Sequence, residues 1–369
     1  MKQFLQWAKS ALYPSQDKSR SHWLNWCRMV LSPGLAAAGF GLGLFSLGMW
    51  EPLEQMVYTR LFLIRDRLSA PQWDERIVVI AIDDRSLAAE GPYPWPRDRY
   101  AALLDHLLAV QPAAVGFDIL MPETTPNDTQ LAESIQFSGN VVLAVGGDAQ
   151  GNSLQVTSSL TEPAQGSFQL GHVKHTPDLD GLSRQTLLYE RYQTSFAPSF
   201  AIALLDVYRQ SLANLLTDES LLTSEQSPQF LDHPERFDQS NPVLINWPGL
   251  TRPKDDGRSS QGLTTLSFSE VMTNDELIDQ LQNKIILVGY TATGIVGTVE
   301  DPIRTPFEQT IPTSGVYLHA AVLDNLLNDR FLTRLAKGWT LVLIILSAVG
   351  SSLILKPLRL GGRLIFLII

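Results

Sequence analysis

The chain has 369 residues, a formal net charge of −10 and one cysteine, Cys27. Because nucleic-acid phosphates attract basic surfaces, this acidic balance argues against a nucleic-acid partner. A lone cysteine also excludes an intramolecular disulfide framework, so any folded domain here depends on its hydrophobic core.

The chain begins with a basic segment, and an apolar segment follows it. Residues 1–28 carry five basic side chains against one acidic side chain, and residues 29–50 contain no charge. An apolar helix of about 20 residues spans the hydrocarbon core of a bilayer. We therefore predict a transmembrane helix over 29–50 that acts as an uncleaved signal anchor. Gly39 and Gly43 have a spacing that lets two helices approach closely, and we expect a homodimer.

The part that follows opens with a helix and a βαβ unit. Residues 53–65 show a helical stripe, which fits either a stalk helix continuing from the membrane or an ordinary first core helix. The β-branched run at 77–82 predicts a strand buried on both faces. An amphipathic helix from Asp98 leads to a second strand at 113–120. This order predicts parallel strands joined by a right-handed crossover.

The middle and last parts of the chain continue this alternation of helices and strands. We expect helices at 127–137, 198–208, 269–271, 275–282 and 316–328, strands at 141–145, 242–247 and 285–289, an antiparallel pair of 168–173 with 184–189, and surface loops at 217–240 and 251–262. The predicted fold class is α/β, with a mixed, largely parallel sheet and flanking helices.

A second apolar segment, at 338–355, follows the last of these helices and predicts another transmembrane helix. The turn at 356–363 is basic, and the run at 364–369 predicts the start of a third, truncated transmembrane helix. Basic residues concentrate in cytoplasmic flanks. We therefore expect 1–28 and 356–363 in the cytoplasm and the domain at 51–337 on the extracytoplasmic side.

The best candidate ligand site lies where the strands end, because ligands of parallel α/β sheets bind beyond the carboxyl ends of the strands. Asp83 and Asp84 follow the first strand, and Asp118 lies near the end of the second. If these strands are neighbours, their carboxylates approach each other and need a compensating cation, for which Arg97 is the nearest basic residue. His319 is placed to complete the same edge. The alternative is that these side chains form buried structural networks and a packed core.

Other motifs favour neither a cofactor nor a metal. The loop at 289–294 lacks the Lys-Ser/Thr ending of a phosphate-binding loop and the three-glycine dinucleotide fingerprint. His172 and His175 have no cysteine or acidic partner at a zinc-ligand spacing. No Ser/His/Asp set follows from the spacing, so we predict no catalytic residue, cofactor or metal.

Several of these segments resemble the CHASE type-2 domain, the second type of cyclase- and histidine-kinase-associated sensory extracellular domain. The resemblance rests on residues 77–84, the Pro94-Trp95-Pro96-Arg97 turn, 116–119, 284–289 and 315–327, and it covers roughly residues 50–335. It implies the input half of a multi-pass receptor in the bacterial plasma (inner) membrane. Its ligand is then an unknown small molecule or a periplasmic partner. Its cytoplasmic output is an adenylate or diguanylate cyclase, a histidine kinase or a Ser/Thr kinase beyond the given residues.

Two other functions stay open at this point. The first is a membrane-anchored extracytoplasmic hydrolase that uses Asp83, Asp84, Asp118 and His319 with a metal ion. The second is a scaffold protein that binds no ligand.

Overall fold

The structure is a computed structural model that describes residues 32–69, 71–147, 153–192, 195–215, 242–249, 262–292, 303–307 and 313–355. The segments predicted at 1–28, 217–240, 356–363 and 364–369 lie outside these residues, as does 251–262 except for its last residue. The chain divides into two compact units. One is formed by Met1–Tyr58 with Arg334–Ile369, and the other by Thr59–Thr333.

The smaller unit is built from helices. Residues 32–46 are helical, residues 47–50 form a turn, and α3 (Glu51–Ser69) begins directly after the turn. The last helix, α13, spans Lys337–Leu355. Among the residues that the structure describes, no helix combines the length with the apolar character that a membrane crossing requires.

Two glycines of the first helix lie against α13. A Cβ atom added at Gly34 would come within 3.0 Å of α13, and one added at Gly41 within 3.1 Å. At Gly39 and Gly43, the pair predicted to contact a second copy, no described atom lies within 4 Å of the Cβ position. The contact with α13 therefore uses a different glycine face, and the Gly39–Gly43 face has no neighbour among the described residues.

The larger unit contains a sheet in the order β10-β1-β11-β2-β3-β5, in which every neighbouring pair is parallel. Its strands are β1 (Ile77–Ile82), β2 (Ala114–Leu120), β3 (Val141–Gly147), β5 (Phe168–His172), β10 (Thr264–Ser267) and β11 (Ile285–Tyr290). A short strand, β4 (Ser153–Leu154), pairs antiparallel with the end of β3. The largely parallel α/β sheet predicted from the sequence is confirmed.

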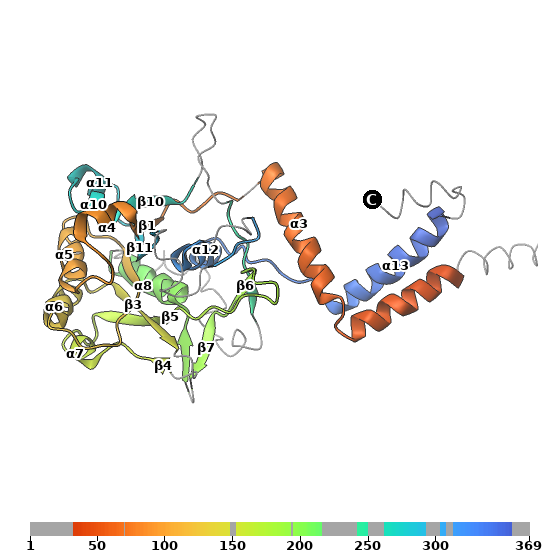
Figure 1. The fold of residues 1–369 in the computed structure, drawn as a ribbon, viewed down its shortest axis with the longest axis horizontal. Helices are drawn as coiled ribbons and strands as arrows, with labels where there is room; N and C mark the ends of the chain where they lie inside the picture. Colours follow the sequence, from red (N-terminus) through yellow and green to blue (C-terminus); the bar gives the residue numbers. More distant parts are fainter. Residues whose placement is uncertain are drawn as a thin grey trace, which may run out of the picture. The chain divides into compact units, whose positions relative to one another are not determined.

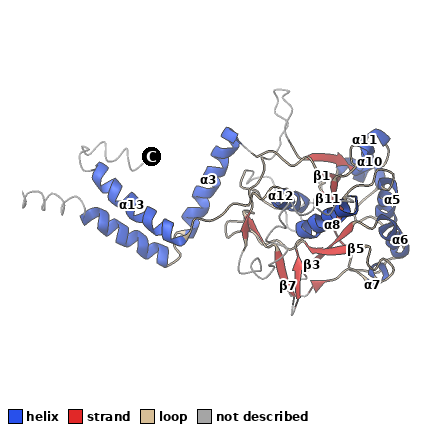
Figure 2. Cartoon of the chain, turned by 180° about the vertical axis from the view of Figure 1, so that it is seen from behind, coloured by secondary structure: helices blue, strands red, loops and turns tan. Residues whose placement is uncertain are grey.

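Helices cover both faces of this sheet (Figures 1 and 2). They are α4 (Asp84–Glu90), α5 (Asp98–Leu107), α6 (Asp128–Ser138), α7 (Ser158–Thr161), α8 (Phe200–Leu215), α10 (Phe268–Val271), α11 (Asp275–Asp279) and α12 (Gly315–Leu327). Val115 and Phe117 of β2 belong to the core that α5 and α6 share. The intervening Gly116 lies against Phe200 of α8 on the opposite face. Successive residues of a strand point to opposite faces of the sheet, so neighbouring residues of β2 contact the two different helical layers.

Glycines on the α8 and α12 face allow these helices to lie close to the sheet. A Cβ atom added at Gly171 would sit 2.5 Å from the backbone of Phe200, and one added at Gly289 would sit 2.7 Å from Val316 Cβ. Real Cβ atoms do not approach other atoms so closely, so any larger residue forces the helix outward. The position of α12, which matters for the site below, is therefore tied to Gly289.

The first two strands are not neighbours, so the condition under which Asp83 and Asp118 would approach each other is not met. β11 lies between them, with Gly289 opposite Ala81 on one side and opposite Asp118 on the other. Both strands still run parallel, as the βαβ pattern predicts. The central strand comes from a segment far along the chain, and a local pattern carries no signal for such an insertion.

The predicted antiparallel pair of 168–173 with 184–189 is also wrong. β5 instead continues the parallel sheet beside β3. β6 (Gln185–Thr186) pairs with β9 (Val243–Leu244), and β7 (Tyr189–Tyr192) forms a hairpin with β8 (Ser195–Pro198). The strand expected at 242–247 is reduced to the two residues of β9.

The second half of α3, from Thr59 to Ser69, belongs to the larger unit and packs there through a face that differs from the predicted apolar stripe. Thr59 accepts a hydrogen bond of 2.8 Å from Arg184, and Phe62 is buried with its ring edge-on to Phe307. Leu61 and Ile64, which belong to the predicted stripe, are more than half exposed. The hydrophobic periodicity did not predict this face because one of its contacts is polar, the hydrogen bond between Arg184 and Thr59.

Candidate functional site

Asp118 and His319 meet at the carboxyl-terminal edge of the sheet. Asp118 lies near the end of β2, and His319 lies one turn into α12, which begins at Gly315. Asp118 Oδ1 and His319 Nε2 are 3.8 Å apart, and each side chain is only 8 % exposed. The sequence analysis predicted both residues for this edge, and the structure brings these two together.

Neither side chain of this Asp118–His319 pair makes a hydrogen bond to another residue in the part of the chain that the structure describes. The distance between them is too long for a direct hydrogen bond. The ring of Phe200 packs edge-on against the imidazole, with the ring centres 5.4 Å apart. Buried polar groups in folded proteins normally have partners, so an unpartnered pair of this kind needs an explanation.

Burial sets the charge state of the pair. It raises the pKa of Asp118 to about 7 and lowers the pKa of His319 to about 4. Near neutral pH the imidazole is therefore uncharged, and a large share of the carboxyl groups keep their proton. The pair offers hydrogen-bond donors and acceptors in a nearly neutral environment and does not form a salt bridge.

Two more histidines interact electrostatically with His319. His172, the last residue of β5, is 1 % exposed, and both of its ring nitrogens lack a hydrogen-bond partner among the described residues. Burial, and then the charges of His319 and Lys174, lower the pKa of His172 to about 3. His175 lies 2.8 Å from the Ser183 hydroxyl, and burial followed by His319 lowers its pKa to about 4. The sequence analysis considered these histidines only as zinc ligands and missed them as part of this buried region.

Asp83 and Asp84 do not join this pair. Asp83 is the N-cap of α4, where it accepts hydrogen bonds from Ser86 and from the Ser267 hydroxyl, the latter at 2.8 Å. Burial alone would raise the pKa of Asp83, but these hydrogen bonds outweigh it and hold the pKa below its ordinary value. Asp84 is an exposed residue in the first turn of the same helix. Asp83 thus has the structural role that the sequence analysis left open.

Arg97 does not compensate Asp118 either. It is buried and forms an ion pair with Asp128, and its guanidinium also donates to the backbone oxygen of Glu123. Asp128 in turn accepts a hydrogen bond of 2.6 Å from the Thr125 hydroxyl. This network fixes the loop before α6, so Arg97 has a structural role between the beginning of α5 and that of α6.

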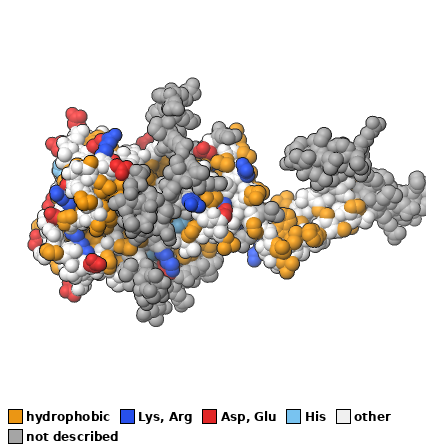
Figure 3. All heavy atoms as spheres, viewed as in Figure 1, with side chains coloured by type: hydrophobic (Ala, Val, Ile, Leu, Met, Phe, Trp, Pro, Cys, Tyr) orange, Lys and Arg blue, Asp and Glu red, His pale blue; other side chains and the backbone are white. Residues whose placement is uncertain are grey.

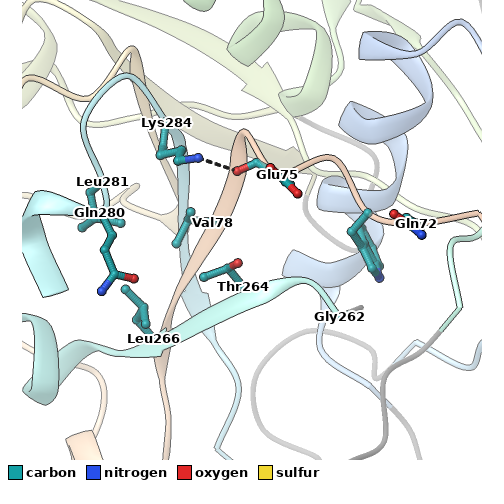
Figure 4. A pocket seen from close by; sticks show the side chains of 10 residues that line it. Gln72, Glu75, Val78, Gly262, Thr264, Leu266, Gln280, Leu281 and Lys284 are labelled. Atoms are coloured by element: carbon teal, nitrogen blue, oxygen red, sulfur yellow. Dashed lines mark hydrogen bonds between the residues drawn. The ribbon is translucent and has the colours of Figure 1, made fainter. Parts of the chain in front are cut away.

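A cavity of about 430 Å³ lies at the opposite, amino-terminal end of the sheet (Figure 4). Gln72, Glu75, Gln280 and Lys284 line part of it, and Lys284 Nζ donates a hydrogen bond of 2.9 Å to the Glu75 backbone oxygen. None of the residues predicted for the site lines this cavity. Its walls come from separate segments of the chain, which explains why no sequence motif indicated it.

Three or more metal-ligating side chains do not gather at any place among the described residues. The family model described as the CHASE2 domain matches residues 35–354. Neither the curated proteins nor the solved structures gave a match to the chain.

Proposed function

The chain belongs to the CHASE2 domain family of sensory domains, and we propose that it is the extracytoplasmic input module of a bacterial membrane receptor. In this proposal a small ligand binds at the Asp118–His319 pair. The ligand shifts the domain between two states, and the shift reaches a cytoplasmic cyclase or kinase. The family match supports the sensory role, and the pair supports the location of the ligand.

The observation that carries the proposal is a buried pair of polar side chains without partners. Burying a polar group without a hydrogen bond costs free energy, on the order of 1–3 kcal/mol in proteins. Asp118 and His319, each with a side chain that is 8 % exposed, make no hydrogen bond to another described residue, and they lie 3.8 Å apart at the edge where parallel sheets bind ligands. A ligand that supplies the missing hydrogen bonds would recover this cost, and differential binding of that kind is what shifts a two-state equilibrium.

The position of α12 provides a route for the signal. Its first turns hold His319, and it ends at Leu327, from where the chain continues to α13 at Lys337. A ligand at the beginning of α12 therefore acts on the helix that precedes α13 directly in the sequence. We propose that a displacement or rotation of α12 is the first step of signalling.

The proposal includes attachment to the membrane through residues 32–46 and α13. Large apolar side chains are exposed on these helices, among them Phe40, Trp339 and Leu346, and Figure 3 shows hydrophobic side chains gathered on this helical part. The basic residues at both flanks support the orientation with the larger unit outside the cytoplasm.

Thiol labelling of intact cells tests this topology. Cys27 is expected to react with a membrane-impermeant maleimide only after the cells are permeabilised. Leu179, which is 91 % exposed, can be replaced in a Cys27→Ser background. We expect the Leu179→Cys variant to react in intact spheroplasts. Labelling of Cys27 in intact cells would contradict the proposed orientation.

We also propose a homodimer through the open face of Gly39 and Gly43. Replacing Gly39 with isoleucine should lower the yield of chemically crosslinked dimer, because the larger side chain keeps the two helices apart. Gly350 is a matched control, since it lies in a helix and also has no described neighbour within 4 Å of its Cβ position. Equal dimer yield in Gly39→Ile and Gly350→Ile would refute this contact.

Thermal unfolding of the full chain in detergent micelles tests the sensory proposal. A panel of small solutes, grouped by charge and hydrogen-bonding capacity, is screened for a rise in melting temperature. A true ligand should stabilise the wild type and fail to stabilise Asp118→Ala, while it still stabilises Asp83→Asn, which changes a carboxylate outside the pair. If no solute distinguishes the two variants, the proposed ligand site is wrong.

The structure gives no support to the hydrolase considered above. That function needs Asp83, Asp84, Asp118 and His319 around one metal ion, whereas β11 separates the first two residues from Asp118 and Asp83 serves as a helix cap. We therefore do not propose this activity.

A further inference from the structure

The beginning of α12 presents hydrogen-bond donors that no side chain caps. Ser314 occupies the N-cap position of this 13-residue helix, but its side chain makes no capping hydrogen bond. Its hydroxyl donates to the backbone oxygen of Tyr290 instead. The first amide groups of a helix have no partner within the helix and carry its positive end. The side chain of Asp118 lies at this end, without a hydrogen bond to another described residue.

The carboxyl group of Asp118 lies close to the first residue of α12. A Cβ atom added at Gly315, the first residue of α12, would have Asp118 Oδ2 at 3.8 Å and Ile303 Cδ1 at 3.9 Å as its nearest neighbours. Both are ordinary van der Waals distances, so an alanine side chain fits at this position beside the carboxyl group without a clash. The other glycines that face α8 or α12 from the sheet, Gly116, Gly171 and Gly289, leave no such room.

We propose that this place binds a small carboxylate anion, which accepts hydrogen bonds from the first amides of α12, from His319 and from the protonated carboxyl group of Asp118. This inference rests on the proposed function and names the chemical class of its ligand. Helix N-termini favour anions, and a protonated carboxyl group donates to a carboxylate where an ionised one would repel it. A cationic ligand would instead face the positive end of α12.

Binding is then coupled to a proton. The anion binds only where Asp118 carries its proton, so a site that has lost this proton takes one up from solvent, and the pair with its ligand carries the single negative charge of the anion. The raised pKa of Asp118, about 7, places this proton uptake near neutral pH. The groups around Asp118 do not oppose it: His319 faces it from α12, Gly289 lies opposite on β11, and Phe200 of α8 covers the imidazole. His172 and His175, which interact with His319, have pKa values of about 3 and 4 and are uncharged in this range.

Isothermal titration of the full chain in detergent micelles, with sodium acetate as the probe, tests this inference. Affinity for acetate should fall about tenfold from pH 6 to pH 8, because only the protonated form of a carboxyl group with a pKa of about 7 binds. Asp118→Asn keeps a neutral donor of similar shape, so it should bind acetate with almost no dependence on pH. Titration in two buffers of different ionisation enthalpy should show the uptake of a proton by the wild type alone.

A steric variant separates binding from folding. Gly315→Ala places a methyl group beside Asp118 Oδ2, at the first residue of the helix end assigned to the anion, and its distances predict no clash with the fold. We expect its melting temperature to match or exceed that of the wild type, while acetate binding falls at least tenfold. Gly338→Ala is the matched control: Gly338 also lies in the first turn of a helix, α13, and has no described neighbour within 4 Å of its Cβ position. It should bind acetate like the wild type.

Three results would overturn the inference. The first is binding of methylammonium in place of acetate, strengthened at high pH and abolished by Asp118→Asn. The second is unchanged acetate affinity in Gly315→Ala. The third is the absence of acetate binding at either pH. If acetate fails while another solute stabilises the wild type but not Asp118→Ala, the anion assignment falls and the sensory site stands. If no solute makes that distinction, both are wrong.

Discussion

As the pH rises from 5 to 8, the wild type should lose stability that the Asp118→Asn variant keeps. Asparagine has nearly the same shape as aspartic acid but cannot ionise. The wild-type carboxyl group is 8 % exposed and has a pKa of about 7 in the folded chain, against an ordinary value of 3.8. The comparison between wild type and variant therefore isolates the free energy of ionising one buried group.

The sign of the effect follows from where the proton is bound. Between pH 3.8 and about 7 the folded state keeps the proton that the unfolded state has released. The protonated carboxyl group therefore contributes stability that is complete below pH 3.8 and is lost as the pH rises to about 7. Integrating this difference from pH 5 to pH 8 gives a loss of about 2–3 kcal/mol in the wild type that the variant does not suffer.

The buried histidines act in the opposite direction, which is why the wild type alone is not informative. The pKa values of His319 and His175 are lowered from 6.5 to about 4. Their contribution to stability is present above pH 6.5 and is lost as the pH falls towards 4. Because both proteins contain these histidines, their contribution cancels in the difference between wild type and variant.

Urea denaturation at pH 5, 6, 7 and 8, in buffers free of carboxylates, measures this difference. The free energy of unfolding of the variant minus that of the wild type should rise by about 2–3 kcal/mol across the series. Asp83→Asn is the control, because the pKa of Asp83 is lowered and its stabilising contribution is already complete at pH 5. A difference for Asp118→Asn that stays constant from pH 5 to pH 8 would refute the assignment of a buried, protonated carboxyl group.

Two further variants test the structural assignments. Arg97→Met leaves the carboxylate of Asp128 buried without its cation, so we expect a loss of about 3–5 kcal/mol in unfolding free energy. The rise in melting temperature caused by a stabilising solute should not change. An altered rise at unchanged stability would instead place Arg97 in the ligand site. Gly289→Ala places a methyl group 2.7 Å from Val316 Cβ, so α12 must shift, and a loss of about 1–3 kcal/mol is expected in the same denaturation assay. Wild-type stability of Gly289→Ala would mean that α12 moves freely over the sheet.

The elements that the sequence predicts well are those with a strong local signal. β1 is a continuous β-branched run, and its six residues are all buried, as expected for a central strand of a parallel sheet. α5 begins at Asp98 and buries the face that its spacing indicates. In both cases the pattern that defines the element is complete within its own residues.

The errors arise where pairing partners are distant in the sequence. The segment 168–173 has the length and composition of a strand, but nothing in it distinguishes a parallel neighbour such as β3 from an antiparallel partner across a turn. Residues 178–181, between this segment and 184–189, have the sequence Asp-Leu-Asp-Gly, which is typical of a turn and favours the second choice. Its acidic side chains instead bind Arg184, with Asp178 Oδ2 2.8 Å from the guanidinium. The acidic residues of a turn-like sequence can thus form ion pairs, so such a sequence does not by itself indicate a hairpin.

The same distinction explains how far the sequence predicts the positions of the candidate site residues. Asp118 and Asp83 were placed at the carboxyl edge by one argument, the position at the end of a strand, and that argument is right for both. What it could not supply is the identity of the strand between them. β11 places a glycine opposite Asp118, and α12, the helix that carries His319, begins at Gly315, later in the chain. Because β11 lies between β1 and β2, Asp118 lies next to His319 of α12 and not next to Asp83.

This insertion also gives the proposed sensor a physical basis. β11 is buried between β1 and β2, and Gly289 holds α12 against it at a contact that admits no side chain. A ligand at Gly315 consequently meets the end of a helix that is tied to the centre of the sheet, and small local shifts there cannot be absorbed by loose packing. Because tightly packed elements move between discrete arrangements, α12 is expected to respond as one body. That response would reach Leu327, the end of the helix nearest in sequence to α13.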